Sequence, residues 1–499
     1  MPRPPHQGAN QRNCALLIGV VVFVSFAYFY GGGGWNQNSR FDLLRAILER
    51  RTLQIDAYHD NTEDKAHFAG HYYSDKAPGL VFLAVPFGVM ARALMRVAGI
   101  DPDSPPAEIA ISYAETLGAV ALPTALACVC LFFLSLRLGA SSSGATFAAL
   151  CMGLWTPLWA YSVVLWAHAL VGACLLFAFA AACKLSDRAK PITEFLLSLA
   201  VGLAAGWAVV TEYPAAPAAV VLACFALYQA RSLGRSARFR VFAGVAAGAL
   251  ACAIVLMVYL HAAFGSIFRP SYSYYGPNSF VFMQQRGYLG LTYPHIDALL
   301  KILFGCRRGL FFAAPVTAAA PVGLGLLWKN KITRPAAVTA TAIVVYYFLF
   351  NASFYQWQAG LSYGPRYAGA AIPVLCLGLA AAFTRATSTC RRVLAVLAAC
   401  SVLSTLMVVS TNTQLSVQDS CPIIHSVWPA FWSGQMSLNR GSMLTLAEAG
   451  SSQSYGAFNL GELAGLHGLY SLFPLLALWA LAALLWLRRG CQPIPVSRS

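Results

Sequence analysis

Long apolar runs separated by short polar connectors recur along the whole chain. About twelve are long enough to cross a bilayer as helices, at residues 14–31, 110–136, 143–162, 164–183, 192–211, 213–230, 241–263, 310–328, 336–350, 368–384, 393–410 and 469–487. Only helices and closed barrels satisfy their backbone hydrogen bonds in lipid, and no alternating strand pattern suggests a barrel. We therefore predict an all-α polytopic membrane protein with about twelve transmembrane helices.

One further apolar run, at residues 77–100, fits either a crossing helix or a helix along the membrane surface. If it does not cross and the N-terminus is inside, every basic connector lies on the cytoplasmic side, as the positive-inside rule requires. These connectors carry Arg137, Lys184, Arg188, Lys190, Arg231, Arg235, Arg238, Arg240, Lys329, Lys331, Arg334, Arg385, Arg391 and Arg392, with Arg488 and Arg489 in the tail. The run is thus predicted to be juxtamembrane, with Phe82, Leu83 and Phe87 toward lipid.

Under this topology four polar segments share the outer face: the long first loop 32–109, the stretch 264–309, the turn 351–367 and the loop 411–468. The inner face has only short basic connectors. We expect a single integral-membrane domain over 1–499, with a core at 14–385 and C-terminal helices at 386–499. The asymmetry between the faces predicts an extracytoplasmic site.

Composition agrees with a membrane protein, since 58% of residues are hydrophobic, 10% are charged and the mean hydropathy is +0.62. The formal charge of +16 is explained largely by the connectors and does not indicate nucleic-acid binding. Many of the 14 cysteines lie inside apolar runs, so no disulfide framework is expected. The glycines at 31–34 make a poor cleavage site, so the first run is interpreted as a membrane anchor.

The segment from Trp35 to Gly79 concentrates the titratable groups. It holds seven of the 18 acidic residues and three of the nine histidines, and the acids are Asp42, Glu49, Asp56, Asp60, Glu63, Asp64 and Asp75. An apolar protein that gathers its ionisable groups in one loop is expected to carry out its chemistry there.

Asp42 is the first candidate for a general base acting on an acceptor hydroxyl, because it lies just beyond the first membrane helix. Ser39 would N-cap the short helix that contains it. The alternative is that Asp42 interacts with the helix dipole or pairs with Arg40 or Arg45. Asp56 is the fallback base. Asp56 and Asp60 are also candidate metal or acceptor ligands, unless they are simply solvated acids.

Phosphate-binding candidates follow from basic residues at headgroup depth. Lys76 precedes a Pro-Gly pair at the start of the juxtamembrane run, although a lysine there can also snorkel. Arg308 and Arg366 each precede a helix on the outer face, where arginine suits a phosphate group. Tyr363, with Trp357 and Tyr367, would stack on a sugar or belong to an interfacial aromatic belt.

Two further residues lie at the outer ends of membrane helices. Glu212 precedes Pro214, and an acid at membrane depth is a functional candidate unless it reaches water as a connector residue. His168 occupies a similar level. In the last loop, Asn459, Glu462 and His467 are expected to cap the final helix. The glycines fit no nucleotide-binding motif, and neither a serine elbow nor HExxH is present.

These motifs together resemble GT-C-type glycosyltransferases, and specifically the family 39-like enzymes related to protein O-mannosyltransferases and lipid A aminoarabinose transferases. Arg40-Phe41-Asp42 is similar to the family's acid-containing R-Y element, and the run from Ser74 to Gly79 resembles its lysine-proline element. Two features depart from the pattern. Asn36-Gln37-Asn38 replaces an acidic pair, and Glu212 stands where relatives often carry a lysine.

The resemblance implies transfer of a sugar from a polyprenyl-phosphate donor to an extracytoplasmic lipid, glycan or protein of the cell envelope. It also implies a first-loop aspartate as base, and a lysine with outer-face arginines on the phosphate. No cofactor is required, and a divalent metal stays open. We expect a multi-pass protein of a bacterial inner membrane with a periplasmic site. The alternatives are a transporter or lipid flippase, which would show midplane charges and inverted repeats, and a membrane scaffold.

Overall fold

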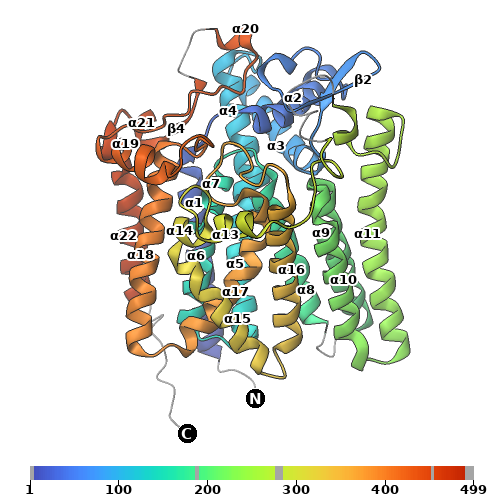
Figure 1. The fold of residues 1–499 in the computed structure, drawn as a ribbon, viewed down its shortest axis with the longest axis vertical. Coiled ribbons are helices and arrows are strands. Elements are labelled where there is room, and N and C mark those ends of the chain that lie inside the picture. The colour runs from blue at the N-terminus through green and yellow to red at the C-terminus, as the bar shows by residue number, and fades with distance from the viewer. Residues whose placement is uncertain (1–4, 186–189, 276–284, 451–454, 489–499) are drawn as a thin grey trace.

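The computed structural model describes residues 5–185, 190–275, 285–450 and 455–488. Eleven helical stretches among these residues are long and apolar enough to cross a membrane, which confirms the polytopic all-α fold. The long helices are α1 (Pro5–Ala27), α5 (Leu122–Arg137), α8 (Ala167–Lys184), α9 (Pro191–Thr211), α10 (Ala216–Gln229), α11 (Arg235–Phe264), α16 (Arg334–Ser353), α17 (Ile372–Arg385), α18 (Ser388–Thr411) and α22 (Phe473–Arg488). In Figure 1 they run roughly side by side along the long axis.

Two predicted spans are broken in the structure. The run 143–162 forms α6 (Ser142–Leu154) and α7 (Leu158–Ser162), interrupted next to Pro157. The run 310–328 forms α14 (Leu310–Ala313), η6 (Pro315–Ala319) and α15 (Ala320–Lys329), interrupted at Pro315. Proline lacks an N–H and clashes with the preceding turn, which explains both breaks. The run 110–136 instead continues α4 (Pro105–Thr116) through η2 (Leu117–Ala121) into α5.

The polar segments gather at one end of the bundle, which we call the loop end and which is uppermost in Figure 1. The basic connectors between α10 and α11, α15 and α16, and α17 and α18 lie at the opposite end. This is the separation that the charge pattern predicts. The tail after Arg488, connector residues 186–189 and part of the 264–309 stretch lie outside the described residues.

The run 77–100 forms α3 (Gly79–Val97), which by length and composition is one of the eleven candidate spans. In Figure 1 it lies at the loop end beneath α2 (Trp35–Arg50). Two of the residues predicted to face lipid contact other helical segments instead, because the Phe82 ring packs on Tyr259 and Phe87 lies against Gly118. The exposed apolar residues are Val89, Met90, Leu94 and Val97.

The first loop is a compact layer. It contains α2, η1 (His59–Asn61) and an antiparallel hairpin of β2 (Lys65–Phe68) and β3 (His71–Ser74), in which Lys65 pairs with Ser74. Helix α2 begins at Trp35, four residues before the predicted cap Ser39, whose hydroxyl instead contacts Ser74 at 2.8 Å.

The first and last loops are tied together. β1 (Phe29–Tyr30) pairs with β4 (Phe458–Asn459), and the glycine run follows directly. The Gly33 amide donates to the Gly441 carbonyl at 2.7 Å, and a Cβ at Gly33 would collide with the Ser442 backbone. Glycine is therefore required here by close packing.

The remaining elements are η3 (Tyr213–Ala215), η4 (Ala230–Ser232), η5 (Ser271–Tyr274), α13 (Ile296–Phe304), η7 (Arg366–Ala371), η8 (Ile423–Val427), α19 (Trp428–Trp432), α20 (Leu446–Ala449), α21 (Leu460–Leu463) and η10 (Gly468–Leu472). Asn459 and Glu462 were expected to cap the final helix, but they form a capping box at the start of the short helix α21, well before α22.

A disulfide corrects the sequence interpretation. Cys306, just before α14, is bonded to Cys421 in the last loop, and their Cα atoms are 4.9 Å apart. The expectation of no disulfide framework was based on the cysteines inside apolar runs. Cys306 and Cys421 lie outside those runs. The bond ties two polar segments 115 residues apart.

Candidate active site

A cluster of ionisable side chains is buried where the first loop meets the loop ends of α8 and α9. We call it the central cluster; its members are Arg40, Asp64, Asp75, Lys76, His168, Glu212 and Arg366. They come from α2, the segment before β2, the turn after β3, the start of α8, the end of α9 and the start of η7. Three cations and three acids thus meet in a region of low polarity, where electrostatic interactions are strong.

Lys76 joins two carboxylates of the first loop. Its Nζ lies 2.8 Å from Asp64 Oδ2 and 2.8 Å from Asp75 Oδ2. Burial lowers the pKa of Lys76, but Asp64 and Asp75 outweigh that effect and the pKa is raised above its ordinary value. Lys76 therefore stays charged. It is held in place because it lies in the short turn between β3 and the start of α3.

Asp75 is fully buried and held by several hydroxyl groups. Ser39 Oγ donates to its Oδ1 at 3.2 Å, Tyr275 bonds to its Oδ2, and Ser271 donates to its backbone carbonyl. Burial raises the pKa of Asp75, and Lys76 opposes that rise. The described part of the 264–309 stretch therefore closes over the cluster, with the Tyr272 ring 6.0 Å from Lys76 Nζ.

Arg40 is almost fully buried on α2. Its Nη1 donates to the Asn36 carbonyl at 2.8 Å, while its Nε has no hydrogen-bond partner. Burial lowers the pKa of Arg40, and nearby Glu212, Tyr272, Asp75 and Asp64 offset part of the effect. A buried guanidinium with an unused N–H is suited to bind an anion.

Arg366 is the second such group. Its guanidinium carbon lies 4.8 Å from the Trp166 ring centre and 5.7 Å from that of Tyr367, and its Nε also has no partner. Among the described residues, no carboxylate forms an ion pair with Arg366. Trp166 is fixed in turn by a 2.9 Å hydrogen bond from its Nε1 to Gln37. The aromatic rings orient the guanidinium and leave its Nε–H available.

His168 and Glu212 form a pair between α8 and α9, with 2.7 Å between His168 Nδ1 and Glu212 Oε1. Burial raises the pKa of Glu212, but His168, Arg40 and Arg366 outweigh it, so the pKa lies below its ordinary value. Glu212 is therefore ionised. It balances part of the positive charge of the two arginines.

Four of the residues expected from the sequence thus come together: Lys76, Arg366, Glu212 and His168. Three others were missed. Arg40 was considered as a partner of Asp42 and as part of the element Arg40-Phe41-Asp42, without a role in the site. Asp75 was placed in the element from Ser74 to Gly79, again without a role, and Asp64 was counted only among the loop acids. The adjacency of Asp75 to Lys76 was a usable signal, whereas nothing in the spacing brings Asp64 to the same lysine.

Asp42 lies elsewhere. It is fully buried, its Oδ1 accepts from Asn61 Nδ2 at 3.2 Å, and its Oδ2 has no partner. Burial raises the pKa of Asp42 well above its ordinary value. The charged groups that act on its pKa are Arg45, Asp60 and Glu448. In this conformation Asp42 lies outside the central cluster.

Asp56 and Asp60 lie outside the central cluster, and the two residues have different hydrogen-bond partners. Asp56 accepts from His71 Nδ1 at 2.7 Å and from the Tyr72 amide at 2.6 Å, on the exposed face of the hairpin. Asp60 accepts from the Leu446 amide at 3.2 Å. Both side chains therefore hold the loop layer together in this structure.

Arg308 and Tyr363 are buried among backbone groups. Arg308 donates to the carbonyls of Gln358, Gly360 and Leu415 at 2.9–3.0 Å. The Tyr363 hydroxyl donates to the Ala313 carbonyl at 2.7 Å. Their polar atoms join loop segments near α14, and burial lowers the pKa of Arg308 to about 10.

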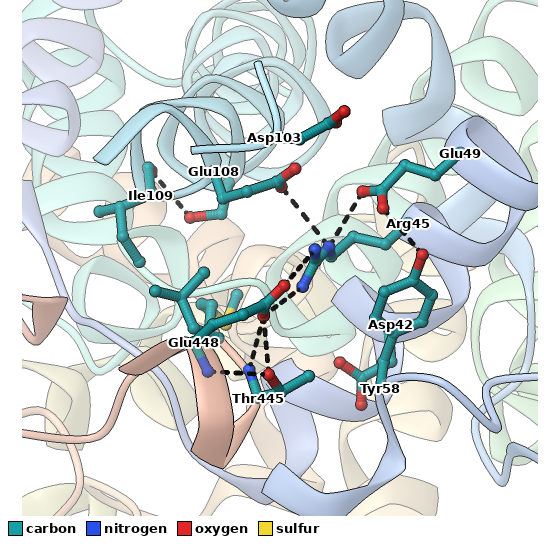
Figure 2. Close-up of polar contacts among 12 residues, drawn as sticks. Asp42, Arg45, Glu49, Tyr58, Asp103, Glu108, Ile109, Thr445 and Glu448 are labelled. Carbon is teal, nitrogen blue, oxygen red and sulfur yellow. Dashed lines mark hydrogen bonds and ion pairs between the residues drawn. The ribbon is translucent and has the colours of Figure 1, made fainter. Parts of the chain in front are cut away.

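A second charged cluster, shown in Figure 2, lies around Arg45. Arg45 donates to both carboxylate oxygens of Glu448 at 2.8 Å and to Glu49 at 3.0 Å. Glu448 also forms a capping box with Thr445 at the start of α20. This cluster binds the first loop to the last.

Next to it, oxygens of Glu49, Asp103 and Glu108 lie within 4.8 Å of one another, close enough to hold a metal ion. The Arg92 guanidinium, however, contacts all three, with Nη1 at 2.8 Å from Glu108 and 3.3 Å from Glu49. Among the described residues this is the group whose ligand atoms could hold a metal ion, and it does not include Asp56 or Asp60. A guanidinium already fills the cation position.

The arrangement of helices in this chain is similar to that in two solved membrane proteins. ArnT from Cupriavidus metallidurans bound to undecaprenyl phosphate matches with a TM-score of 0.49 and 15% identity, covering 80% of this chain and 64% of that one. The archaeal oligosaccharyltransferase AglB from Archaeoglobus fulgidus, in complex with an inhibitory peptide and a dolichol-phosphate, matches with a TM-score of 0.45 and 11% identity, covering 81% and 56%.

Both are GT-C-type membrane glycosyltransferases, the group that the first-loop motifs resemble. The chain spans less than two thirds of the length of these neighbours. No protein-family model and no curated protein matches the sequence. Similarity at this level concerns the arrangement of helices and assigns no residue roles.

Proposed function

We propose that the protein is a membrane glycosyltransferase that moves a sugar from a polyprenyl-phosphate donor to an extracytoplasmic acceptor. The observation that carries this proposal is the convergence of Arg40, Lys76 and Arg366 at the loop end, with the Nε atoms of both arginines unpartnered. Three buried cations at the end of a membrane bundle suit a phosphate presented from the bilayer. A donor with a phosphate leaving group also needs no nucleotide site, which agrees with the lack of a nucleotide-binding motif in the sequence.

In the proposed reaction an acceptor hydroxyl oxygen attacks the anomeric carbon of the sugar. The bond between that carbon and the donor phosphate oxygen breaks, and its electron pair stays on the phosphate. Arg40, Lys76 and Arg366 stabilise the charge that develops there. The hydroxyl proton passes to a carboxylate acting as general base.

Three first-loop carboxylates are candidates for that base. Asp42 and Asp56 follow from the sequence, but the first is buried away from the cations and the second lies on the exposed hairpin. Asp64 contacts Lys76 at 2.8 Å, and its side chain retains 13% exposure. We assign the base role to Asp64 and keep Asp42 and Asp56 as the alternatives. Transfer rates of the three single asparagine variants separate them.

The loop end is proposed to face the extracytoplasmic side of a bacterial inner membrane, because the basic connectors gather at the other end. Introduced cysteines would test this orientation. A cysteine at Glu63, whose side chain is 43% exposed, should react with a membrane-impermeant maleimide in intact spheroplasts, and one at exposed Lys331 should react only after lysis. The reverse result would reject the orientation.

The reaction itself is tested with purified protein in nanodiscs and a panel of prenyl-phosphate sugars with extracted envelope acceptors. Arg366→Met is compared with Arg269→Met, which removes an exposed arginine of the same loop end outside the cluster. Transfer lost only in Arg366→Met supports the proposal. No transfer by wild type with any donor of the panel, although prenyl phosphate binds, would favour a transporter or flippase.

A further inference from the structure

The disulfide between two polar segments of the loop end is the first link of a chain of contacts that leads to the central cluster. It joins Cys306, which lies between α13 and α14, to Cys421 in the last loop. Neighbouring residues reinforce the link, since Arg307 Nε donates to the Asp419 carbonyl at 3.0 Å. The Cys421 amide donates to the Asp419 carboxylate at 2.9 Å. The segment before α14 is therefore fixed against the last loop.

Arg308 extends this link to a third segment. It follows Cys306 by two residues, is 1% exposed and donates to the Leu415 carbonyl of the last loop at 2.9 Å. Its Nε also donates to the Gln358 carbonyl at 3.0 Å, and its Nη2 donates to the Gly360 carbonyl at 2.9 Å. A guanidinium carries several donors in one rigid plane, so a single side chain can hold the turn at 358–360 against the last loop.

The turn at residues 358–360 has a backbone that needs such support. Ala359 has a φ of +60° and Gly360 has a φ of +64°. A residue with a Cβ adopts this left-handed conformation only when its surroundings impose it. Arg308 donates to the carbonyls on both sides of Ala359, which is fully buried. The conformation of the turn therefore depends on the position of Arg308.

This turn lies against Arg366 of the central cluster. A Cβ at Gly360 would be 3.9 Å from Arg366 Nη2. The rings of Trp166 and Tyr367 also lie next to the guanidinium, with their centres 4.8 Å and 5.7 Å from its carbon. Because no carboxylate of the described residues forms an ion pair with Arg366, these packing contacts set its position.

We infer that the Cys306–Cys421 disulfide, acting through Arg308, positions Arg366, so that phosphate recognition at the central cluster requires the oxidised bond. The inference rests on the proposed function, in which Arg366 binds the donor's phosphate. Without the bond, the segment before α14 separates from the last loop, the turn at 358–360 relaxes and Arg366 moves from its place. Disulfides persist in oxidising compartments, and the loop end is proposed to lie in one.

The test measures binding of undecaprenyl phosphate to the full chain in nanodiscs, with undecaprenol as the probe that lacks the phosphate. The ratio of the two affinities reports phosphate recognition, whereas a general disturbance of the bundle would weaken both ligands. The variant is Cys306→Ser/Cys421→Ser. The matched control is Cys390→Ser/Cys400→Ser, which replaces two exposed free cysteines of α18. Thermal unfolding checks that each variant is folded.

We expect the affinity ratio to fall about tenfold in Cys306→Ser/Cys421→Ser and to stay unchanged in the control. A water-soluble phosphine should cause the same fall in wild type, and reoxidation should reverse it. The phosphine takes up the oxygen of one water molecule, and the two hydrogens of that water end on the two thiols. It should not lower the ratio of Cys306→Ser/Cys421→Ser further. An unchanged ratio in this variant would overturn the inference.

A mutant cycle tests the route through Arg366. Arg366→Met alone should lower the ratio, and adding Cys306→Ser/Cys421→Ser should lower it no further. Additive losses would overturn the route from the disulfide to Arg366. Arg308→Lys keeps the charge but lacks the planar set of donors, so it should lower the ratio as the cysteine variant does. A normal ratio in Arg308→Lys would overturn the part assigned to Arg308.

Sugar transfer distinguishes failure of this inference from failure of the proposed function. Cys306→Ser/Cys421→Ser should raise the KM for a prenyl-phosphate sugar about tenfold, with a smaller change in kcat. Transfer by this variant with an unchanged KM rejects the inference and leaves the enzyme. An affinity ratio that depends on the disulfide, with no transfer by wild type, rejects the enzyme and leaves Arg366 as a phosphate site that the bond controls.

Discussion

The Nζ of Lys76 lies 2.8 Å from the carboxylate of Asp64, and both side chains are largely buried at the loop end. The pair joins the turn after β3 to the segment before β2. One partner has the charge to bind a phosphate, and the other has the charge to accept a proton. Their contact suggests that donor binding by Lys76 would release Asp64 for its role as base.

Replacing Lys76 by methionine should lower the rate of sugar transfer by about 10²–10³-fold, because one charge that stabilises the leaving phosphate is lost. The measurement is kcat/KM with a prenyl-phosphate sugar. Lys301→Met is the control, since Lys301 is exposed on α13, outside the central cluster, and forms an ion pair with Asp297. Equal loss in both variants would contradict a specific role for Lys76.

The general base is separated by three single variants, Asp64→Asn, Asp42→Asn and Asp56→Asn. We expect a loss of about 10²–10⁴-fold in kcat for Asp64→Asn, and a small change for the other two. Asp42 is buried outside the central cluster, and burial raises its pKa, so its amide replacement should affect transfer little. A large loss in Asp42→Asn alone would move the base to that residue.

Arg308 and Arg366 should respond in opposite ways to replacement by methionine. Arg308→Met leaves several buried carbonyls without their donor, so we expect a loss of about 1.5–3 kcal/mol in stability. Arg366→Met removes no ion pair and should lower activity with little change in unfolding temperature. Unfolding temperature and transfer rate, measured for both variants, distinguish the structural role of Arg308 from the binding role of Arg366. An unchanged unfolding temperature in Arg308→Met would refute the structural role.

The Arg45–Glu448 pair predicts a pH-dependent tie between the loops. The hydrogen bond from Arg45 lowers the pKa of Glu448 to about 2, below its unfolded value of about 4.5. Its contribution to stability is therefore fully present above pH 4.5 and is lost as the pH falls toward 2.

Glu448→Gln should accordingly lower the unfolding temperature at pH 7, and its difference from wild type should shrink as the pH falls below 4.5. Unfolding scans in detergent across this pH range measure the effect. Asp297→Asn, an exposed acid on α13, provides the control and should show little difference at any pH. A constant difference between Glu448→Gln and wild type down to pH 3 would contradict the account.

The depth at which the residues of the central cluster lie along the bundle could be predicted from the sequence. Which of these residues contact one another could not. Lys76, His168, Glu212 and Arg366 each lie where a helix meets a polar segment, so their common level follows from the apolar runs. That Arg40 lies near Glu212 depends on how helices far apart in sequence pack. No periodicity encodes that contact.

The choice of Asp42 illustrates a second limit. Residues 37–46 of α2 are all buried, so the helix has no polar face from which the direction of Asp42 could be read. Helix breaks at Pro157 and Pro315 had a local signal, but the apolar runs around them are continuous. The contact between Cys306 and Cys421 again depends on loop packing.

The central claim is tested most directly by following one donor molecule in purified protein. A radiolabelled sugar on undecaprenyl phosphate is incubated with envelope acceptors, and both the transferred label and the freed undecaprenyl phosphate are measured. We predict equal amounts of the two products with wild type, and loss of both in Lys76→Met at an unchanged unfolding temperature. Formation of neither product by wild type across the donor panel, or equal turnover in Lys76→Met, would contradict the account.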